Sequence, residues 1–428
     1  MEFRTDTIAA IATAPGRGGI AVVRVSGPDA WAVAEKVAGK RVAAGDAGRF
    51  FRARFADVDD GLMLVFRGPH SYTGEDSVEF QGHGGSIAPR RVLEACLAAG
   101  ARLARRGEFT ERAFLNGKLD LSAAEAVIDL VDARTDHAAA DAFARLGGAL
   151  SRPFEQLYAK AIDISGKLEH ALDFDEDELP QDFATGVSEE IAALRRRTEG
   201  LIATAHEGRL LREGALVVLA GAPNAGKSSL MNALLGTDRA IVDASAGTTR
   251  DSIEEGMLIG GWQVRLTDTA GLRAAADLIE AEGVKRAEAL IGNADLVVAL
   301  DCDIQGALKI HAKCDLDKGP DGGANGLDAL HVSAKTGEGL AALKAAIAKR
   351  LSAQAAHGDE ENGADITTRH KELLAKASAA LARAESGVDL AVAANEVRIA
   401  AEELGRIIGK TYSDDLLDAL FSRFCIGK

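Results

Sequence analysis

The sequence predicts a multidomain fold: an N-terminal α+β domain, then a helical domain that an inserted α/β domain interrupts. Two observations lead to this prediction. A chain of 428 residues is longer than one hydrophobic core usually supports. The apolar pattern changes from short runs between Gly-rich turns to helical spacing, then to alternating strands and helices, and then back to helical spacing. An insertion of this kind is tolerated where two chain ends lie close together on a surface.

The changes in pattern place the boundaries of four segments. Residues 1–118 form the predicted α+β domain, and residues 119–212 form the first part of the helical domain. Residues 214–352 form the inserted α/β domain. Residues 353–428 form the second part of the helical domain, after a polar, Gly-containing linker at 353–363.

Apolar spacing within these segments predicts individual strands and helices. Strands are predicted at Ile20–Val25, Leu62–Phe66, Ala215–Ala220, Val264–Thr267 and Leu296–Leu300. Helical structure is predicted at Pro89–Ala99, Leu119–Leu146, Phe154–Leu172, Glu189–Leu211, Ser229–Leu235 and Thr367–Phe424. The Gly-rich stretch from Cys302 to Leu330 is predicted to be short of regular structure, which would trim the outer part of the α/β domain.

Composition excludes several classes of protein. The formal net charge is −15, so the chain does not bind nucleic acid through a general positive field. The four cysteines form no CxxC pair and no zinc-type spacing with histidine, which favours a reducing compartment. The segment Met1–Ala10 lacks the pattern of a signal peptide, and no apolar run reaches the roughly 20 residues that span a bilayer. We therefore expect a cytoplasmic protein that has no membrane partner.

A phosphate-binding loop is the most specific motif in the sequence. The apolar run Ala215–Ala220 leads into residues 221–228, GAPNAGKS, which match the pattern GxxxxGKS and precede a helical run. Glycines let backbone N–H groups point at a polyphosphate, and the helix N-terminus adds a positive dipole end. Lys227 is expected to reach the β- and γ-phosphates, and Ser228 to offer its hydroxyl to Mg²⁺. The alternative is a Gly-rich turn before a helix, but the strand–loop–helix context favours the phosphate loop.

Two further motifs follow in the order that a GTPase requires. The segment Gly247–Asp251, GTTRD, supplies threonine hydroxyls, of which Thr249 is expected to bind Mg²⁺ when the γ-phosphate is present. The segment Asp268–Gly271, DTAG, follows a predicted strand, so Asp268 is placed to hold the Mg²⁺ shell. Each motif is weak alone. In this order they predict a Ras-like P-loop GTPase domain.

The motif that would recognise guanine is present in altered form. Lys313 and Asp315 stand where GTPases have NKxD, but the Asn position holds Ala312, which removes bonds that tie the base loop to the P-loop. The loop Ser333–Lys335, SAK, is the usual support for the base. We favour guanine over the alternative of a surface turn. Leu272 stands where Ras-like proteins have the Gln that orients water, so another group must do so.

Segments from nearly the whole chain resemble one family. The P-loop GAPNAGKSS, the GTTRD loop and DTAGLR are similar to those of the tRNA modification GTPase family MnmE, also called TrmE. The other similar segments are Asp6–Pro28, His70–Gly85, Gly107–Leu121, Ser413–Leu417 and Phe424–Lys428.

This resemblance implies a function that the residues alone do not show. It implies a K⁺-dependent GTPase that forms a homodimer and, with the FAD-containing protein MnmG (GidA), a heterotetramer. The complex would add a carboxymethylaminomethyl or aminomethyl group to C5 of the wobble uridine of certain tRNAs. The one-carbon unit would come from a tetrahydrofolate derivative bound by the N-terminal domain, which also drives dimerisation. Two alternatives stay open: a switch GTPase of ribosome assembly or membrane remodelling, and a folate-binding scaffold with a regulatory nucleotide domain.

The motifs and the resemblance together assign roles to individual residues. The GTP-binding residues would be Asn224, Ala225, Gly226, Lys227, Ser228, Ser229, Asp243, Ala244, Ser245, Ala246, Gly247, Thr248, Thr249, Asp268, Thr269, Ala270, Gly271, Lys313, Asp315, Ser333, Ala334 and Lys335. The metal ligands would be Ser228 and Thr249 for Mg²⁺, and Asn224, Asp243, Ser245 and Thr248 for K⁺. The folate-binding residues would be Arg24, Glu79, Lys118 and Lys428.

Three residues are candidates for catalysis. The first is Lys227. The second is Glu280, which matches the glutamate that orients water in the family, with Glu282 as the alternative. A glutamate without this role would be a solvated carboxylate on a helix. Cys425 stands near the C-terminus. Its thiol is either a nucleophile close to a one-carbon carrier or a small buried side chain in the last helix.

Overall fold

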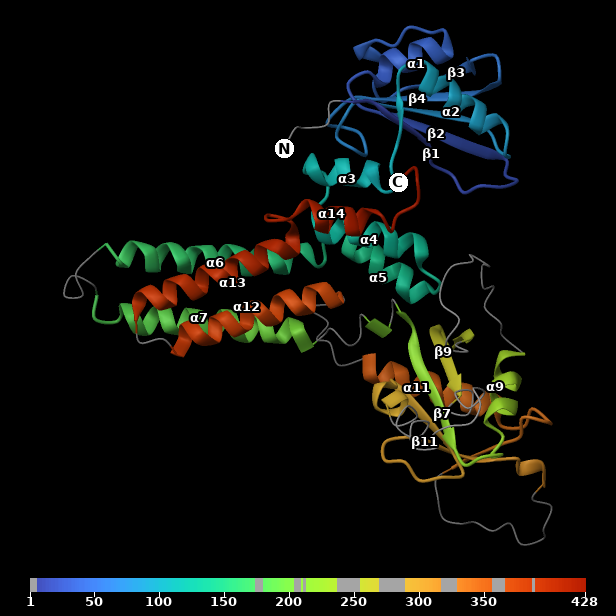
Figure 1. Ribbon diagram of the computed structural model, residues 1–428, viewed down its shortest axis with the longest axis vertical. Coiled ribbons are helices and arrows are strands. Elements are labelled where there is room, and N and C mark those ends of the chain that lie inside the picture. The colour runs from blue at the N-terminus through green and yellow to red at the C-terminus, as the bar shows by residue number, and fades with distance from the viewer. Residues whose placement is uncertain are drawn as a thin grey trace, which may run out of the picture. The chain divides into compact units, whose positions relative to one another are not determined.

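The chain forms two compact units in the computed structural model (Figure 1). The structure describes residues 6–173, 180–203, 209–210, 213–236, 255–268, 289–316, 329–355, 366–386 and 389–428. The first unit comprises residues 6–131, 145–173 and 390–428. The second comprises residues 132–144 and the described residues between 180 and 389. Within these ranges, no helix has both the length and the apolar character needed to cross a membrane.

The first unit contains a six-stranded sheet in the order β3-β4-β5-β2-β1-β6. The strands are β1 (Ile8–Ile11), β2 (Ile20–Ser26), β3 (Phe50–Phe55), β4 (Asp59–Phe66), β5 (Ser77–His83) and β6 (Arg102–Leu103). Neighbouring strands are antiparallel except for the parallel pair of β1 and β6. The strands predicted at Ile20–Val25 and Leu62–Phe66 are confirmed as β2 and as the second half of β4.

Two helices cover one face of this sheet. Val33 of α1 (Ala30–Ala38) and Val92 of α2 (Ala88–Ala98) pack in one buried cluster with sheet residues such as Phe80. Side chains alternate between the two faces of a strand, so β2 buries every second residue in this cluster and presents the others on the opposite face. The predicted helix at Pro89–Ala99 is confirmed as α2.

The helical pattern over Leu119–Leu146 is confirmed as two helices, α4 (Leu121–Asp132) and α5 (Asp136–Leu146). Each begins at a capping side chain. The Asp120 carboxylate accepts a hydrogen bond from the backbone N–H of Ala123 at 2.8 Å. The Thr135 hydroxyl accepts one from Ala138 at 3.1 Å, so the chain starts a new helix after Asp132. Helix α5 belongs to the second unit except for its last two residues, whereas α4 belongs to the first unit except for its last residue. The first unit also contains α3 (Glu108–Leu115), α6 (Ser151–Ala171), α13 (Leu390–Ile408) and α14 (Asp414–Phe421).

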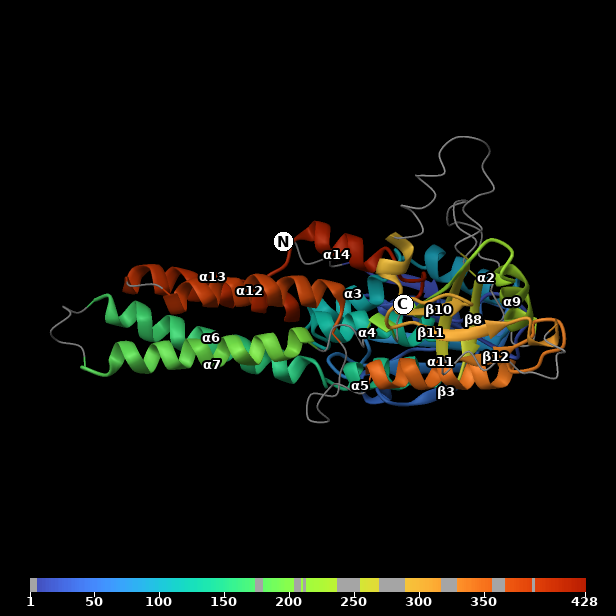
Figure 2. The ribbon, with the colours of Figure 1, turned by 90° about the horizontal axis from the view of Figure 1, so that it is seen from below.

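The second unit contains a six-stranded sheet in the order β12-β11-β10-β7-β9-β8. The strands are β7 (Ala215–Gly221), β8 (Glu255–Ile259), β9 (Trp262–Asp268), β10 (Leu296–Leu300), β11 (Leu308–Ala312) and β12 (Leu330–Val332). All neighbouring pairs are parallel except β8 with β9. Leu234 of α9 (Lys227–Leu235) and Ile347 of α11 (Leu340–Ala355) are fully buried against this sheet, along which α11 runs (Figure 2). The strands predicted at Ala215–Ala220, Val264–Thr267 and Leu296–Leu300 are confirmed.

Two predictions for the second unit were wrong in detail. The stretch from Cys302 to Leu330 contains a regular strand, β11, which pairs with both β10 and β12. Its sequence alternates apolar residues with the polar residues Lys309 and His311, and only Ile310 is buried, so it lacks the continuous apolar run of the neighbouring strands. Residues 353–355 belong to α11 rather than to a linker. The helical run predicted at Ser229–Leu235 is confirmed as α9, which begins at Lys227.

Two helix pairs join segments from before and after the α/β domain. Helix α6 packs against α13 in the first unit, and α7 (Phe183–Ala203) packs against α12 (Thr368–Ser386) in the second (Figure 1). Arg195 of α7 donates to Glu385 of α12 at 2.8 Å. Such pairing is what an inserted domain requires, and the predicted fold class is confirmed. The residue numbers given to the domain boundaries stay predictions.

Candidate nucleotide-binding site

The phosphate-binding loop connects β7 to α9, as its sequence predicts. The backbone turns through left-handed conformations at Asn224 (φ +63°) and Gly226 (φ +98°). Gly221 is required at the strand end because a Cβ there would lie 2.7 Å from the carbonyl oxygen of Leu300. Helix α9 begins directly after the loop, so its unpaired N-terminal N–H groups lie where an anion would bind.

The Lys227 ammonium lies inside this loop. The residue is only 5% exposed, and its Nζ donates to the carbonyl oxygens of Gly221 and Ala222, both at 2.9 Å. Both acceptors are neutral, so a phosphate group would supply the opposite charge that these carbonyl groups lack. The loop therefore holds a cation ready for a phosphate group.

Ser228 and Asp268 meet beside the loop although they are far apart in the sequence. Asp268 is the last residue of β9, and its Oδ2 accepts a hydrogen bond from Ser228 Oγ at 2.7 Å. Asp268 is 8% exposed. A hydroxyl and a carboxylate are hard oxygen ligands of the kind that Mg²⁺ prefers, so this pair fits the predicted Mg²⁺ site.

Removing the Ser228 hydroxyl tests this site. Ser228→Ala is expected to raise the Mg²⁺ concentration that gives half-maximal GTP hydrolysis by about tenfold or more, because one oxygen ligand is lost. Steady-state assays over a Mg²⁺ series measure this change. Ser386→Ala, which removes an exposed hydroxyl at the end of α12, is the control and should behave as wild type. An unchanged Mg²⁺ requirement in Ser228→Ala would exclude this residue as a ligand.

A pocket of about 310 Å³ lies between α9 and the chain segments that follow β11 and β12. The predicted base-recognition residues Lys313, Asp315, Ala334 and Lys335 line it. Leu230, Ile310 and Val332 contribute apolar walls. An apolar slot with a few polar groups suits a flat heterocyclic base, and Ala312 lines the same pocket at the altered position of the motif.

Side-chain hydrogen bonds hold the two base loops. Lys313 Nζ donates to the carbonyl oxygen of Asn224 at 2.7 Å, so a tie between the base loop and the P-loop persists without the motif's asparagine. The Ser333 hydroxyl donates to Asp315 Oδ1 at 2.6 Å, and Ser333 is fully buried. The carboxylate of Asp315 is thereby oriented at the edge of the pocket.

Many predicted GTP and K⁺ ligands lie outside the described residues. These are Asp243, Ala244, Ser245, Ala246, Gly247, Thr248, Thr249, Thr269, Ala270 and Gly271, as are Glu280 and its alternative Glu282. Of the predicted K⁺ ligands, the structure describes Asn224.

Two residues predicted to bind folate lie side by side on the sheet of the first unit. Arg24 of β2 and Glu79 of β5 are register partners, and Arg24 Nε donates to Glu79 Oε1 at 2.9 Å. The Arg24 guanidinium also lies 5.1 Å from the ring centroid of Tyr72 and 5.6 Å from that of Phe109. This arrangement places aromatic faces beside a carboxylate acceptor and a guanidinium donor.

Lys118, the third predicted folate ligand, approaches the same region from the chain after α3. Its Nζ donates to the carbonyl oxygen of Pro69 at 3.0 Å. Its side chain also lies close to Gly74, where a Cβ would be 3.3 Å from Lys118 Cγ. The segment between these two contacts carries Tyr72, which connects Lys118 to the Arg24 pair.

The C-terminal tail, residues 425–428, lies against the edge of the first unit's sheet. Ile426 forms an antiparallel bridge with Arg106. Gly427 packs so closely on β1 that a Cβ would lie 2.2 Å from the carbonyl oxygen of Ile11. This packing places Lys428 next to β1. Cys425 is exposed and lies beyond α14, so its interpretation as a buried side chain in the last helix was wrong.

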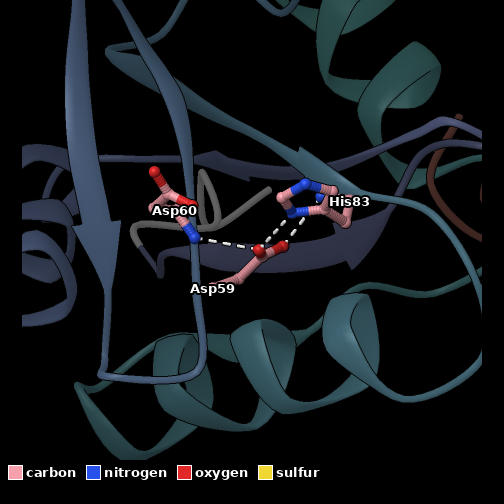
Figure 3. Close-up of side chains that lie close together, drawn as sticks. All are labelled: Asp59, Asp60 and His83. Carbon is pink, nitrogen blue, oxygen red and sulfur yellow. Dashed lines mark hydrogen bonds and ion pairs between the residues drawn. The ribbon is translucent and has the colours of Figure 1, made fainter.

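Asp59, Asp60 and His83 form a separate cluster where β4 begins and β5 ends (Figure 3). The side chain of Asp59 is 8% exposed. It accepts backbone hydrogen bonds from Asp60 and His83, both at 2.8 Å, and its Oδ1 lies 2.6 Å from His83 Nδ1. These partners satisfy the carboxylate, so the cluster is explained as a structural ion pair that joins two strands.

This ion pair predicts a pH-dependent contribution to stability. The bond to Asp59 raises the pKa of His83 above its usual 6.5. Burial raises the pKa of Asp59, but the bonds from His83 outweigh it and leave the pKa below 3.8. The stability that His83 contributes is fully present below about pH 6.5 and is lost as pH rises through the pKa of His83 in the folded protein. The stability that Asp59 contributes is lost in acid, as its carboxylate becomes protonated.

We therefore expect His83→Ala to lower the melting temperature more at pH 5.5 than at pH 9. Differential scanning fluorimetry at both values measures this difference. His70→Ala, which removes an exposed histidine from the same domain, is the control and should show no such pH dependence. An equal loss at both pH values in His83→Ala would contradict the ion pair.

Comparison with known proteins covers the whole chain. Residues 7–118 match the family described as GTP-binding protein TrmE N-terminus, and residues 121–425 match the MnmE helical domain. The tRNA modification GTPase MnmE of Nitrosomonas europaea is 41% identical over 99% of both chains. The proteins of the same name from Neisseria meningitidis serogroup C and Chromobacterium violaceum are each 41% identical over 100% of both chains. The resemblance seen in the sequence is confirmed: the chain belongs to the MnmE family of tRNA modification GTPases, and it is a GTP hydrolase.

Proposed function

We propose that the chain acts in the cytoplasm as a K⁺-activated, homodimeric GTPase of a tRNA-modifying complex. With the FAD-containing partner MnmG (GidA), in a heterotetramer, it adds a carboxymethylaminomethyl or aminomethyl group to C5 of the wobble uridine of certain tRNAs. One observation carries this proposal: a phosphate loop with a buried lysine lies in a chain whose entire length matches tRNA modification GTPases. A similarity confined to the α/β domain would have supported only a switch GTPase.

The nucleotide site fits GTP with two cations. Lys227 would hold the β- and γ-phosphates, Ser228 and Asp268 would hold Mg²⁺, and Asp315 would accept N–H bonds from guanine. Asn224 lies in the P-loop, where Lys313 holds its backbone carbonyl, and its side-chain amide oxygen would be a ligand for K⁺. A cation there would offset negative charge that develops on the phosphates during hydrolysis.

The first unit fits a folate. The rings of Tyr72 and Phe109 offer flat surfaces on which a pterin would stack, and the Glu79 carboxylate would accept its N–H groups. Arg24, Lys118 and Lys428 supply positive charge for the glutamate tail. The folate would supply the one-carbon unit, and these residues would bind and orient it.

Wobble nucleosides from a deletion strain test the proposal. Mass spectrometry of tRNA hydrolysates should show loss of the modified uridines in the deletion strain, restored by the wild-type gene. Lys227→Ala should fail to restore them, because GTP hydrolysis is required. Normal wobble nucleosides in the deletion strain would contradict the proposal and favour a ribosomal switch. Full restoration by Lys227→Ala would instead indicate a folate-binding scaffold.

Hydrolysis rates in different salts test the K⁺ requirement. The wild-type protein should hydrolyse GTP faster in KCl than in NaCl at equal ionic strength. Asn224→Ala should lose this difference, because a proposed ligand is removed. Equal wild-type rates in the two salts would overturn the K⁺ role and leave the GTPase assignment intact.

A further inference from the structure

The loop that recognises the base lacks the side chain that usually fastens it. Ala312 lines the base pocket at the position where GTPases have an asparagine, and its methyl group neither donates nor accepts a hydrogen bond. A loose loop would have to be ordered when the nucleotide binds, at a cost in conformational entropy for each residue fixed. Another group must therefore fix the backbone that leads to Asp315.

Asp301 contacts this backbone from the neighbouring strand. It follows β10 directly, and its carboxylate oxygens lie 3.4 and 3.3 Å from the Ala312 nitrogen, which donates to them. Its Oδ1 also lies 2.7 Å from His311 Nδ1. One carboxylate thus holds the last two residues of β11, immediately before Lys313.

The backbone around this carboxylate is itself unusual. Asp301 has a left-handed conformation (φ +51°), and so has Lys313 (φ +59°). Such conformations are unfavourable for a residue other than glycine, and they persist where the surroundings enforce them. The Asp301 N–H donates to the carbonyl oxygen of Ile310 at 3.0 Å, which turns the carboxylate toward the end of β11.

The same contacts extend to the second base loop. The ring of His311 lies against that of His331 on β12, with centroids 5.2 Å apart in an edge-on arrangement. Strand β12 leads into Ser333, whose hydroxyl holds Asp315. Asp301, His311 and His331 therefore link the strands that carry both base-recognition loops.

We propose that Asp301, acting through His311 and the Ala312 N–H, is a specificity-determining positioning residue that compensates for the missing asparagine and holds Asp315 in place for guanine. This inference rests on the proposed guanine-nucleotide function and deepens it. Asp301 does not touch the base. Its effect is to pre-organise the loop, so that Asp315 meets both N–H groups of guanine without a further ordering cost.

The selectivity for guanine nucleotides shows whether Asp301 positions Asp315 or only supports the fold. Guanine offers Asp315 two N–H groups, whereas hypoxanthine lacks the exocyclic amine and offers one. The ratio of the Kd for IDP to the Kd for GDP therefore reports how well Asp315 is placed. In the full-length chain, Asp301→Ala should weaken GDP binding by about tenfold, the value of one hydrogen bond to a charged group, and IDP binding by less, which lowers the ratio.

Two further variants make the test specific. Asp301→Asn keeps an oxygen acceptor for the Ala312 N–H and should give an intermediate Kd for GDP. Adding Ala312→Asn to Asp301→Ala should restore part of the lost selectivity, because the motif's asparagine then supplies the missing tie. Asp303→Ala, two residues away and paired with Lys309 on the surface, is the matched control and should bind as wild type.

The possible failures are distinguishable. If Asp301→Ala binds GDP with the same Kd as the wild type and the Asp303→Ala control, this inference alone is overturned. Equal losses for GDP and IDP would also overturn it, because a merely structural role predicts no change in the ratio. Failure of the wild-type protein to bind any guanine nucleotide would instead overturn the proposed function.

Discussion

Lys227→Ala is expected to lower kcat for GTP hydrolysis by on the order of 10²–10³-fold, the effect of removing one electrostatic stabiliser of a transition state. Lys227 is the buried cation of the P-loop, and its ammonium donates to two neutral carbonyl groups. Negative charge on the phosphates increases as the terminal bond breaks, so this ammonium stabilises the transition state more than the bound substrate. Phosphate release under saturating GTP measures the change.

A matched lysine variant makes this result interpretable. Lys349→Ala removes an exposed ammonium from α11 in the same domain and should leave kcat unchanged. Circular dichroism should show that both variants retain the wild-type helix content. A Lys227→Ala protein that folds and hydrolyses GTP at the wild-type rate would contradict the role of the loop.

Glu108→Ala is expected to destabilise the first unit by about 3–5 kcal/mol, the range for breaking a buried ion pair. The Glu108 side chain is 1% exposed and accepts hydrogen bonds from Arg102 at 2.6 Å, Arg112 at 3.1 Å and the Arg105 N–H at 2.8 Å. Arg112 is itself 5% exposed and keeps Asp6 and Glu75 as partners in the alanine variant, so the loss comes from the hydrogen bonds that the buried Glu108 carboxylate accepts. Amide hydrogen exchange of β1 and β6, the strands beside this network, measures the loss.

The same network predicts sensitivity to acid. Burial raises the pKa of Glu108, but the hydrogen bonds from Arg102 and Arg105 outweigh it and leave the pKa below its usual 4.5. The stability that this carboxylate contributes is therefore present above about pH 4.5 and lost as pH falls through the folded pKa. Glu94→Ala is the control, because Glu94 forms an exposed pair with Arg90 and its loss should cost less than about 1 kcal/mol. Equal exchange rates in the two variants would contradict the prediction for Glu108.

Three strands of the α/β domain and its phosphate loop could be predicted because their signals are local. Strand β7 is a continuous apolar run, and the glycines and Lys227 follow it at fixed spacing. Strand β11 was missed because it lies next to the end of the sheet, alternates polar and apolar residues, and stands among glycines. The break between α4 and α5 carried a readable signal, since Thr135 is a good N-cap, but the uninterrupted apolar spacing concealed it.

In the nucleotide site too, residues in local motifs could be predicted, whereas a residue that acts through contacts distant in the sequence could not. Ser228 and Asp268 were both predicted to serve Mg²⁺, and the parallel pairing of β7 with β9 explains why they meet. Asp301 carried no motif, because its role depends on the register of β10 with β11 and on a left-handed backbone that the sequence does not reveal. The change to Ala312 was visible in the sequence, but the residues that compensate for it were not.

Titration calorimetry of the full-length protein with guanine nucleotides, in the presence of Mg²⁺ and K⁺, tests the central claim most directly. The account predicts a single site per chain for GDP and for a non-hydrolysable GTP analogue, with ADP at least about tenfold weaker because Asp315 finds no matching N–H groups on adenine. It also predicts that Lys227→Ala weakens binding of the triphosphate analogue. A protein that folds but shows no binding of either guanine nucleotide would contradict the account.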